Sequence, residues 1–293
     1  MATKPKKRCA MSVLLCIGSW TGGKFLATAL VAISLFCVDH GMTEAWRGAF
    51  LAGGFVAVIG IYARRTLYET GNFTEAKKLA KVIQTKNKTG ILKEPVPKLS
   101  LFYYSILTLG NILFGLFPFT YCKDLLVNMG YSAAQIALQS WFVGIFFTLN
   151  LIGYFFLVRF FCPLKIIKYR SYGAILLMLF LPYLIKHAGS NIDILMLQFL
   201  VLLFGVDSIP ASPIIYKLFP ILNRSKAILI PNAFSGAFGF IFLNFSIPVL
   251  SHYFFQYTFT ILALPVAVIS VFGIQHFQKA YQNNINGRNI EYG

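Results

Sequence analysis

The chain has 293 residues, of which 57% are hydrophobic and only 12% charged, and its mean hydropathy is +0.70. These values exclude an ordinary soluble domain and predict an all-α polytopic membrane protein. In a soluble chain the formal net charge of +17 would suggest a nucleic-acid partner. Here the basic residues lie in short segments between apolar runs, so we expect a lipid bilayer and no nucleic acid.

The apolar runs predict eight transmembrane helices, because about 20 apolar residues cross the hydrocarbon of a bilayer. The first run follows the basic segment Met1–Arg8, and a cleaved signal peptide is an alternative interpretation of this start. The run is long for a signal peptide, which favours a first span that contains Lys24. The predicted spans are Ser19–Val38, Arg47–Tyr62, Leu101–Tyr121, Gln135–Val158, Ser171–Ile185, Ile194–Tyr216, Ala227–Leu250 and Phe254–Ile274.

Positive charge predicts the orientation of these spans. The segment Ala63–Lys98 holds nine Lys and Arg residues, and with a cytoplasmic N-terminus all others fall on the inner side except Lys24, Arg47, Lys123 and Lys186. Lys and Arg gather on the cytoplasmic side of membrane proteins, so we predict an N-in, C-in chain in the plasma or inner membrane of a cell. The predicted units are a two-span N-terminal part (1–62), a cytoplasmic connector (63–98), a six-helix bundle (99–276) and a cytoplasmic tail (277–293).

Polar residues inside the predicted spans follow a second pattern. Asn, Gln, Asp or Lys occurs within spans one, three, four, six and seven, whereas spans two, five and eight have none away from their ends. A polar group that faces lipid is costly, so such groups turn toward protein or a wet cavity. We therefore predict that every third helix is a lipid-facing support.

Asp207 is the most distinctive single residue, because it lies within span six and is followed by Pro210 and Pro213. A carboxylate inside a membrane is costly unless it is paired, hydrated or neutral, and this makes proton coupling one interpretation. The other interpretation is structural: Asp207 caps the broken helix or pairs with a basic loop residue.

Amide side chains are the next candidates, because they both donate and accept hydrogen bonds. They either line a solute path or bond neighbouring helices together. Lys24 is either a counter-ion for an anionic solute or a side chain that snorkels to the membrane surface. The candidate amides are Asn111, Gln139, Asn150, Asn232 and Asn244.

Motifs of enzyme and metal chemistry are missing from the sequence. It has no H-E-x-x-H, no G-x-S-x-G and no P-loop, and its five cysteines form no C-x-x-C pair. We therefore expect no enzyme activity, no metal, no cofactor and no use of ATP.

Two motifs carry a resemblance to a known family. The first stands at the end of span two and is similar to R-R-x-L-x-E-x-x-x-F, and the second lies between spans six and seven and is similar to E-L-F-P-x-x-x-R. On these motifs the chain resembles the major facilitator superfamily, most closely the metabolite:proton symporter branch that includes proline/betaine transporters. The residues that match the first motif are Arg64, Arg65, Leu67, Glu69 and Phe73, preceded by a helix start similar to W-R-x-x-F at Trp46, Arg47 and Phe50. Those that match the second are Leu218, Phe219, Pro220 and Arg224, followed in the next span by Asn232, Gly236 and Gly239.

The resemblance implies a partial facilitator fold in which the eight spans equal the family's helices five to twelve. It implies proton-coupled uptake of a small osmolyte, amino acid or carboxylate, with Arg64, Arg65, Glu69 and Arg224 at the cytoplasmic gate. Two departures concern that gate: Lys217 stands where the family has Glu, and the loop after span four has no Asp. Since helices one to four have no counterpart, the alternative is a non-transporting remnant, or one part of a split transporter that needs a second chain.

Overall fold

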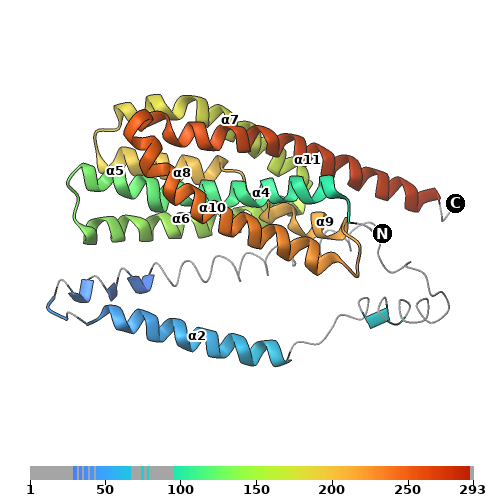
Figure 1. Cartoon of the computed structure of the whole chain (residues 1–293), viewed down its shortest axis with the longest axis horizontal. Coiled ribbons are helices and arrows are strands. Elements are labelled where there is room, and N and C mark those ends of the chain that lie inside the picture. Colours follow the sequence, from blue (N-terminus) through green and yellow to red (C-terminus); the bar gives the residue numbers. More distant parts are fainter. Residues whose placement is uncertain are drawn as a thin grey trace.

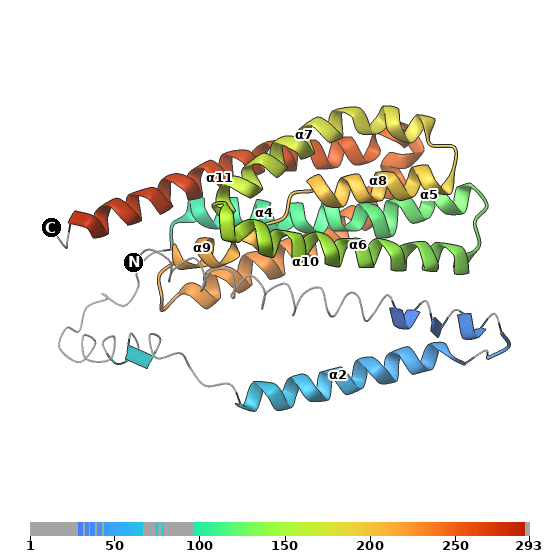
Figure 2. The ribbon, with the colours of Figure 1, turned by 180° about the vertical axis from the view of Figure 1, so that it is seen from behind.

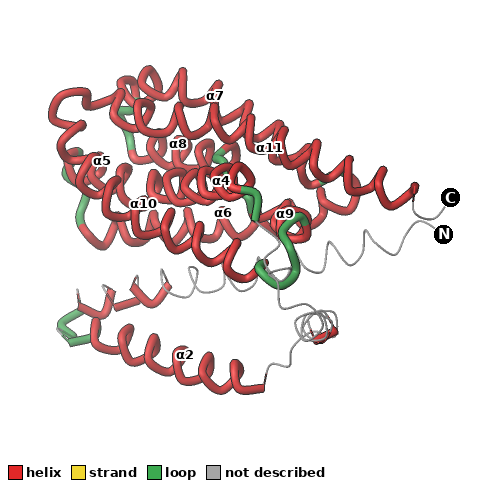
Figure 3. The backbone as a smooth tube through the Cα atoms, turned by 45° about the vertical axis from the view of Figure 1, so that its right-hand side comes forward, coloured by secondary structure: helices red, strands yellow, loops and turns green. Residues whose placement is uncertain are grey.

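The computed structural model describes residues 29–31, 33, 34, 36–38, 40–42, 44–66, 74, 75, 78 and 96–290. This part of the chain is helical and contains no strand (Figure 3). The predicted first span lies largely outside it, as do Lys24 and Glu69.

Helix α2 (Trp46–Thr66) corresponds to the predicted second span and runs alongside the later helices in two opposite views (Figures 1 and 2). Its described side chains are almost all exposed, and a Cβ placed on Gly53 or Gly60 would meet no neighbouring atom within 4 Å. The main hydrophobic core contains only residues from Val96 onward. The apolar surface of α2 is therefore uncovered by the described part of the chain.

The remaining helices pack together into one bundle. Helix α4 lies against both α10 and α11, while α7 lies against α11 and α8 (Figure 1). Ser132 and Ser190 start α6 and α8 with capping boxes, in which each serine bonds the backbone three residues ahead and receives a bond in return. The elements are α4 (Lys98–Leu116), the π-helical segment η1 (Phe117–Tyr121), α5 (Cys122–Asn128), α6 (Ala133–Phe160), α7 (Pro163–His187), α8 (Asn191–Phe204), the 3₁₀ turn η2 (Ile209–Ala211), α9 (Ser212–Lys217), α10 (Arg224–Phe254), the 3₁₀ turn η3 (Phe255–Tyr257) and α11 (Thr258–Ile290).

Helix α7 differs from the predicted fifth span, because it begins at Pro163 rather than Ser171. Proline is favoured in the first helical turn, where its missing N–H has no partner to lose. Arg170, which the charge count assigned to the inner loop, consequently lies within the helix and is only 8% exposed. The predicted span Ser171–Ile185 is thus only part of α7, and the longer helix carries a buried charged group just before that span.

Four stretches are long and apolar enough to cross a membrane: Lys98–Asn128, Ala133–Phe160, Asn191–Lys217 and Arg224–Asn284. The last of these has 61 residues, and it turns back at η3 so that α10 and α11 run in opposite directions (Figure 1). By length and composition these four stretches are candidate membrane spans. The count of eight spans and the N-in, C-in orientation stay predictions.

Candidate functional site

The predicted sixth span is broken in the structure. Helix α8 ends at Phe204, and regular structure resumes only at η2 and α9, after an extended Gly205. Pro210 and Pro213 stand in the first turns of η2 and α9, where a missing N–H does no harm. Because the helix stops, the carbonyls of Leu202 and Leu203 lack the amides that would have followed them, and side chains can bond them instead.

Three side chains from α6 and α7 converge on these two carbonyls. Arg170 donates from Nε to the Leu203 oxygen and from Nη2 to the Leu202 oxygen, both at 3.1 Å. Tyr154 donates to Leu203 at 3.0 Å and Asn150 donates to Leu202 at 3.1 Å. The Arg170 guanidinium also lies over the Tyr154 ring, 4.4 Å from its centroid. The break is thus held by side chains of the neighbouring helices.

Asp207 lies inside the break and is 6% exposed. Its Oδ1 accepts a hydrogen bond from the Ile209 amide at 2.9 Å, and its Oδ2 lies 4.0 Å from Nη1 of Arg170. Asp207 therefore both caps the next turn and pairs with a basic residue, although that residue belongs to a helix and not to a loop. Nη1 is buried and has no hydrogen-bond partner within the described chain, so the pair is held by charge attraction rather than by a direct hydrogen bond.

Glycines allow the neighbouring helices to approach the break closely. A Cβ on Gly173 of α7 would lie 2.5 Å from the Phe204 ring, and one on Gly110 of α4 would lie 2.9 Å from the Val206 side chain. Such distances are too short for a real contact, so any larger residue would push these helices apart. The two glycines thus allow α7 and α4 to contact the residues on either side of Gly205.

Gln139 is placed in a different cluster. Its Nε2 donates to Oε1 of Gln198 at 2.7 Å, and Nε2 of Gln198 donates to the Pro118 carbonyl at 2.7 Å. Both glutamines are buried, and Pro118 belongs to η1, where the helix widens. This chain of bonds links α6, α8 and η1, which is the interhelical role left open for the amides.

The other predicted amides lie apart from Asp207. Oδ1 of Asn232 is 3.2 Å from the Tyr104 hydroxyl, at the contact between α4 and α10. Asn111 is half-buried on α4, and Asn244 is exposed on α10, where it donates to the Phe240 carbonyl of its own helix at 2.7 Å. Asn150 is the only one of the five predicted amides that shares a cluster with Asp207.

The predicted gate residues are not gathered in one place. Arg224 opens α10 and donates from Nη2 to the Phe219 carbonyl at 3.2 Å, which closes the loop behind α9. Arg65 is exposed on α2, where Arg64 also lies, and Glu69 falls outside the described residues. A charge pair at the gate stays a prediction.

Sequence reasoning missed Arg170 and Tyr154. Two signals were present: Pro163 marked an earlier helix start, and Tyr154 follows Asn150 by four residues, the spacing that puts two side chains on one helix face. Across the described positions, no group of three His, Cys, Asp or Glu side chains could hold a metal ion.

Comparisons with protein-family models, with characterised proteins and with solved structures find no match to this chain. The class of the protein follows from the structure itself. It is a helical protein with four stretches long and apolar enough to cross a membrane, and it buries an Arg–Asp pair at a broken helix.

Proposed function

We propose that the chain is a secondary active transporter of the facilitator type that couples uptake of a small solute to protons through Asp207. The observation that carries this proposal is the buried Arg170–Asp207 pair at the break between α8 and α9. Ionisable residues within membrane spans are costly and mark functional sites, and secondary transporters build their ion and substrate sites on discontinuous helices. The resemblance to proton symporters adds the substrate class: an osmolyte, amino acid or carboxylate.

The pair supplies a coupling mechanism. A proton on Asp207 removes its negative charge and leaves the Arg170 guanidinium without its counter-ion. Arg170 keeps its bonds to the carbonyls of Leu202 and Leu203, so protonation weakens only the link to the segment that follows the break. Movement of η2 and α9 relative to α7 is then the step that a proton controls.

Uptake by the purified chain tests the proposal. Proteoliposomes are given labelled proline, glycine betaine or a dicarboxylate under an inward proton gradient, and we expect accumulation of one of them. Asp207→Asn removes the exchangeable proton, so gradient-driven accumulation is lost while exchange of solute across the membrane is kept. Asp193→Asn, which changes an exposed carboxylate at the opposite end of α8, is the matched control and keeps accumulation. Accumulation by Asp207→Asn would contradict the coupling role.

A second function is favoured by the exposed face of α10: the chain is one part of a split transporter. Phe234, Phe238 and Phe242 are exposed and stack in sequence, with ring centroids 5.9 and 5.1 Å apart. Beside them lies an apolar hollow of about 670 Å³ that Phe245 and Val249 help to line. Aromatic faces of this size lie against lipid or against further helices.

The two functions predict different outcomes. Uptake by the purified chain alone excludes the split-transporter alternative. If the chain alone is inactive, a photo-crosslinking residue at position 238 is expected to capture a second helical chain in native membranes, whereas the same residue at position 176, on the outer face of α7, captures none. Inactivity without any captured chain would indicate a non-transporting remnant.

A further inference from the structure

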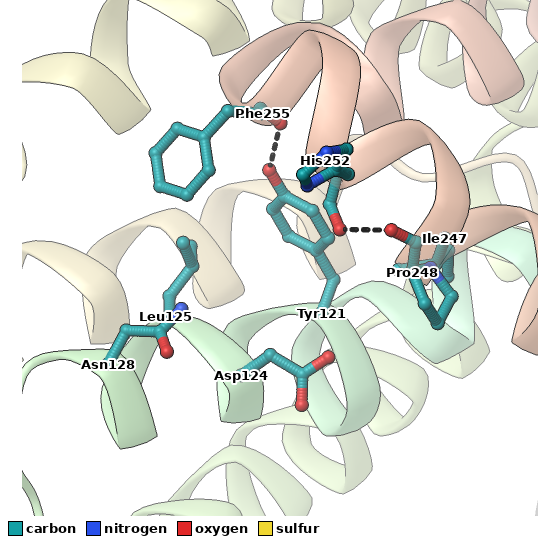
Figure 4. Close-up of a pocket in the computed structure, with 9 residues that line it drawn as sticks. Tyr121, Asp124, Leu125, Asn128, Ile247, Pro248, His252 and Phe255 are labelled. Carbon is teal, nitrogen blue, oxygen red and sulfur yellow. Dashed lines mark hydrogen bonds between the residues drawn. The ribbon is translucent and has the colours of Figure 1, made fainter.

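A pocket of about 310 Å³ lies between α5 and the end of α10 (Figure 4). In Figure 1, α5 and α9 lie toward opposite ends of the bundle. On the side of η1 and α5 the pocket is lined by Tyr121, Asp124 and Asn128. On the other side it is lined by Ser251 and His252, from the last turn of α10. The volume suits a small ligand, and the predicted topology places the pocket on the outer side of the membrane.

Asp124 is the only acidic residue in the lining, and in the described structure no basic side chain comes within ion-pair distance of it. Lys123, its neighbour in sequence, is exposed and forms no ion pair with it. Beneath the carboxylate the floor is apolar, formed by Leu125, Ile247 and Pro248. A lone carboxylate beside an apolar floor attracts a ligand that is both cationic and partly hydrophobic.

Aromatic rings complete this environment. The Tyr121 hydroxyl donates to the Phe255 carbonyl at 2.9 Å (Figure 4), while the Tyr121 ring is only 3% exposed and stacks on Phe117. Phe255 and His252 add two further rings. Aromatic faces attract ammonium groups, most strongly quaternary ones, because their π-electrons are negative above the ring.

The rim of the pocket is held in a strained conformation. Phe255 has φ 28° and ψ −93°, and it is the only non-glycine residue in the described chain with a positive φ. Such a backbone conformation is strained and persists where its surroundings hold it, as in ligand clamps. Here the hydrogen bond from Tyr121 to the Phe255 carbonyl fixes the end of α10 over the pocket.

We propose that this pocket binds a small organic cation, with its ammonium group against Asp124 and the exposed ring of Phe255. The site goes beyond the proposed transport function and does not depend on it, because binding at equilibrium requires neither a proton gradient nor a second helical chain. A neutral molecule of the same shape would gain only the apolar floor and would bind more weakly.

Choline and its uncharged carbon analogue, 3,3-dimethylbutan-1-ol, form a matched pair of probes. Binding is measured by calorimetry on the purified full chain in a maltoside detergent, which avoids the choline headgroups of phosphatidylcholine. We expect saturable binding of choline, at least tenfold weaker binding of the analogue, and at least a tenfold loss of choline affinity in Asp124→Asn. Asp124→Glu keeps the charge and retains part of the affinity.

Glu44→Gln is the control, because it removes another exposed carboxylate that lies outside the pocket and pairs with Arg47 at 2.8 Å. Its choline affinity is expected to equal that of the unaltered chain. The proposal is overturned if the unaltered chain binds no choline, if the uncharged analogue binds as tightly, or if Asp124→Asn binds choline unchanged while eluting as the same folded species.

Discussion

Two contacts in the bundle use polar groups in opposite ways. Between α4 and α10 the groups are neutral: Thr108 Oγ1 lies 2.9 Å from Ser235 Oγ, and Ser235 donates to the Ser105 carbonyl at 2.9 Å. Among α6, α7 and α8 the groups include the charged pair Arg170 and Asp207. Both contacts are buried, but the free energy required to remove a charge from water is far larger than that for a hydroxyl.

The state of the backbone explains the difference. At the first contact α4 and α10 are continuous helices, so their carbonyls are already bonded and hydroxyls suffice to link them. At the second contact α8 has ended, and the carbonyls of Leu202 and Leu203 are available to bond the guanidinium of Arg170. The glutamine pair at η1 is intermediate, since there a widened helix offers the single carbonyl of Pro118 to a neutral amide. Charge is buried where the helix is broken.

The largest expected effect follows from Arg170→Met. It leaves Asp207 buried without its counter-ion and removes donors from two carbonyls, and breaking a buried pair on one side costs about 3–5 kcal/mol. We expect a loss of this size in the free energy of unfolding, measured by denaturant titration of the chain in detergent.

Two further variants test whether this loss of stability comes from the buried charge pair. Arg159→Met changes an exposed arginine at the end of α6 and is expected to shift the free energy of unfolding by less than about 0.5 kcal/mol. Adding Asp207→Asn to Arg170→Met removes the orphaned carboxylate and is expected to recover part of the loss. If the double variant is less stable than Arg170→Met by the full amount that Asp207→Asn alone costs the unaltered chain, the two side chains do not interact.

Substitutions in the glutamine pair are expected to cause a stability loss of intermediate size, which is larger for Gln198 than for Gln139. Gln198→Leu leaves both the Pro118 carbonyl and the Gln139 amide unpaired, and an unsatisfied buried polar group costs about 1–3 kcal/mol. Gln139→Leu leaves only the Gln198 oxygen unpaired and is expected to cost about half as much. Thermal unfolding of the two variants side by side measures the order, and equal losses would show that the Pro118 carbonyl finds another donor.

From residue 98 onward the sequence predicted helices close to the observed ones except at the start of α7, because long apolar runs with sharp ends leave little choice of structure. It also singled out Asp207, since an acid before two prolines is anomalous in a span. Arg170 was missed because counting charge treats Lys165, Lys168 and Arg170 alike, although the spacing from Ile167 to Ala174 places Arg170 on the buried face of α7.

Other features depend on contacts that no local pattern contains. The carbonyls of Leu202 and Leu203 can accept hydrogen bonds from Arg170 only because α8 ends where it packs against α6 and α7. The exposed position of Asn244 was equally hidden, because α10 is apolar on every side and its residue pattern does not indicate which face turns inward. Polar residues in membrane spans were therefore recognisable as a set, while their partners were not.

The smallest expected effect tests the neutral contact. Thr108→Val keeps the shape of the side chain and removes its hydroxyl, while Ser235 keeps its bond to the Ser105 carbonyl. Interhelical hydrogen bonds in membranes contribute about 0.6 kcal/mol on average, so we expect a loss of this order in the free energy of unfolding. Thr148→Val is the matched control, because Thr148 bonds only the Gly144 carbonyl of its own helix, and its loss is expected to be smaller still. A loss from Thr108→Val as large as that from Arg170→Met would mean that hydroxyls stabilise this bundle as strongly as the buried charge, and the contrast between the two contacts would fail.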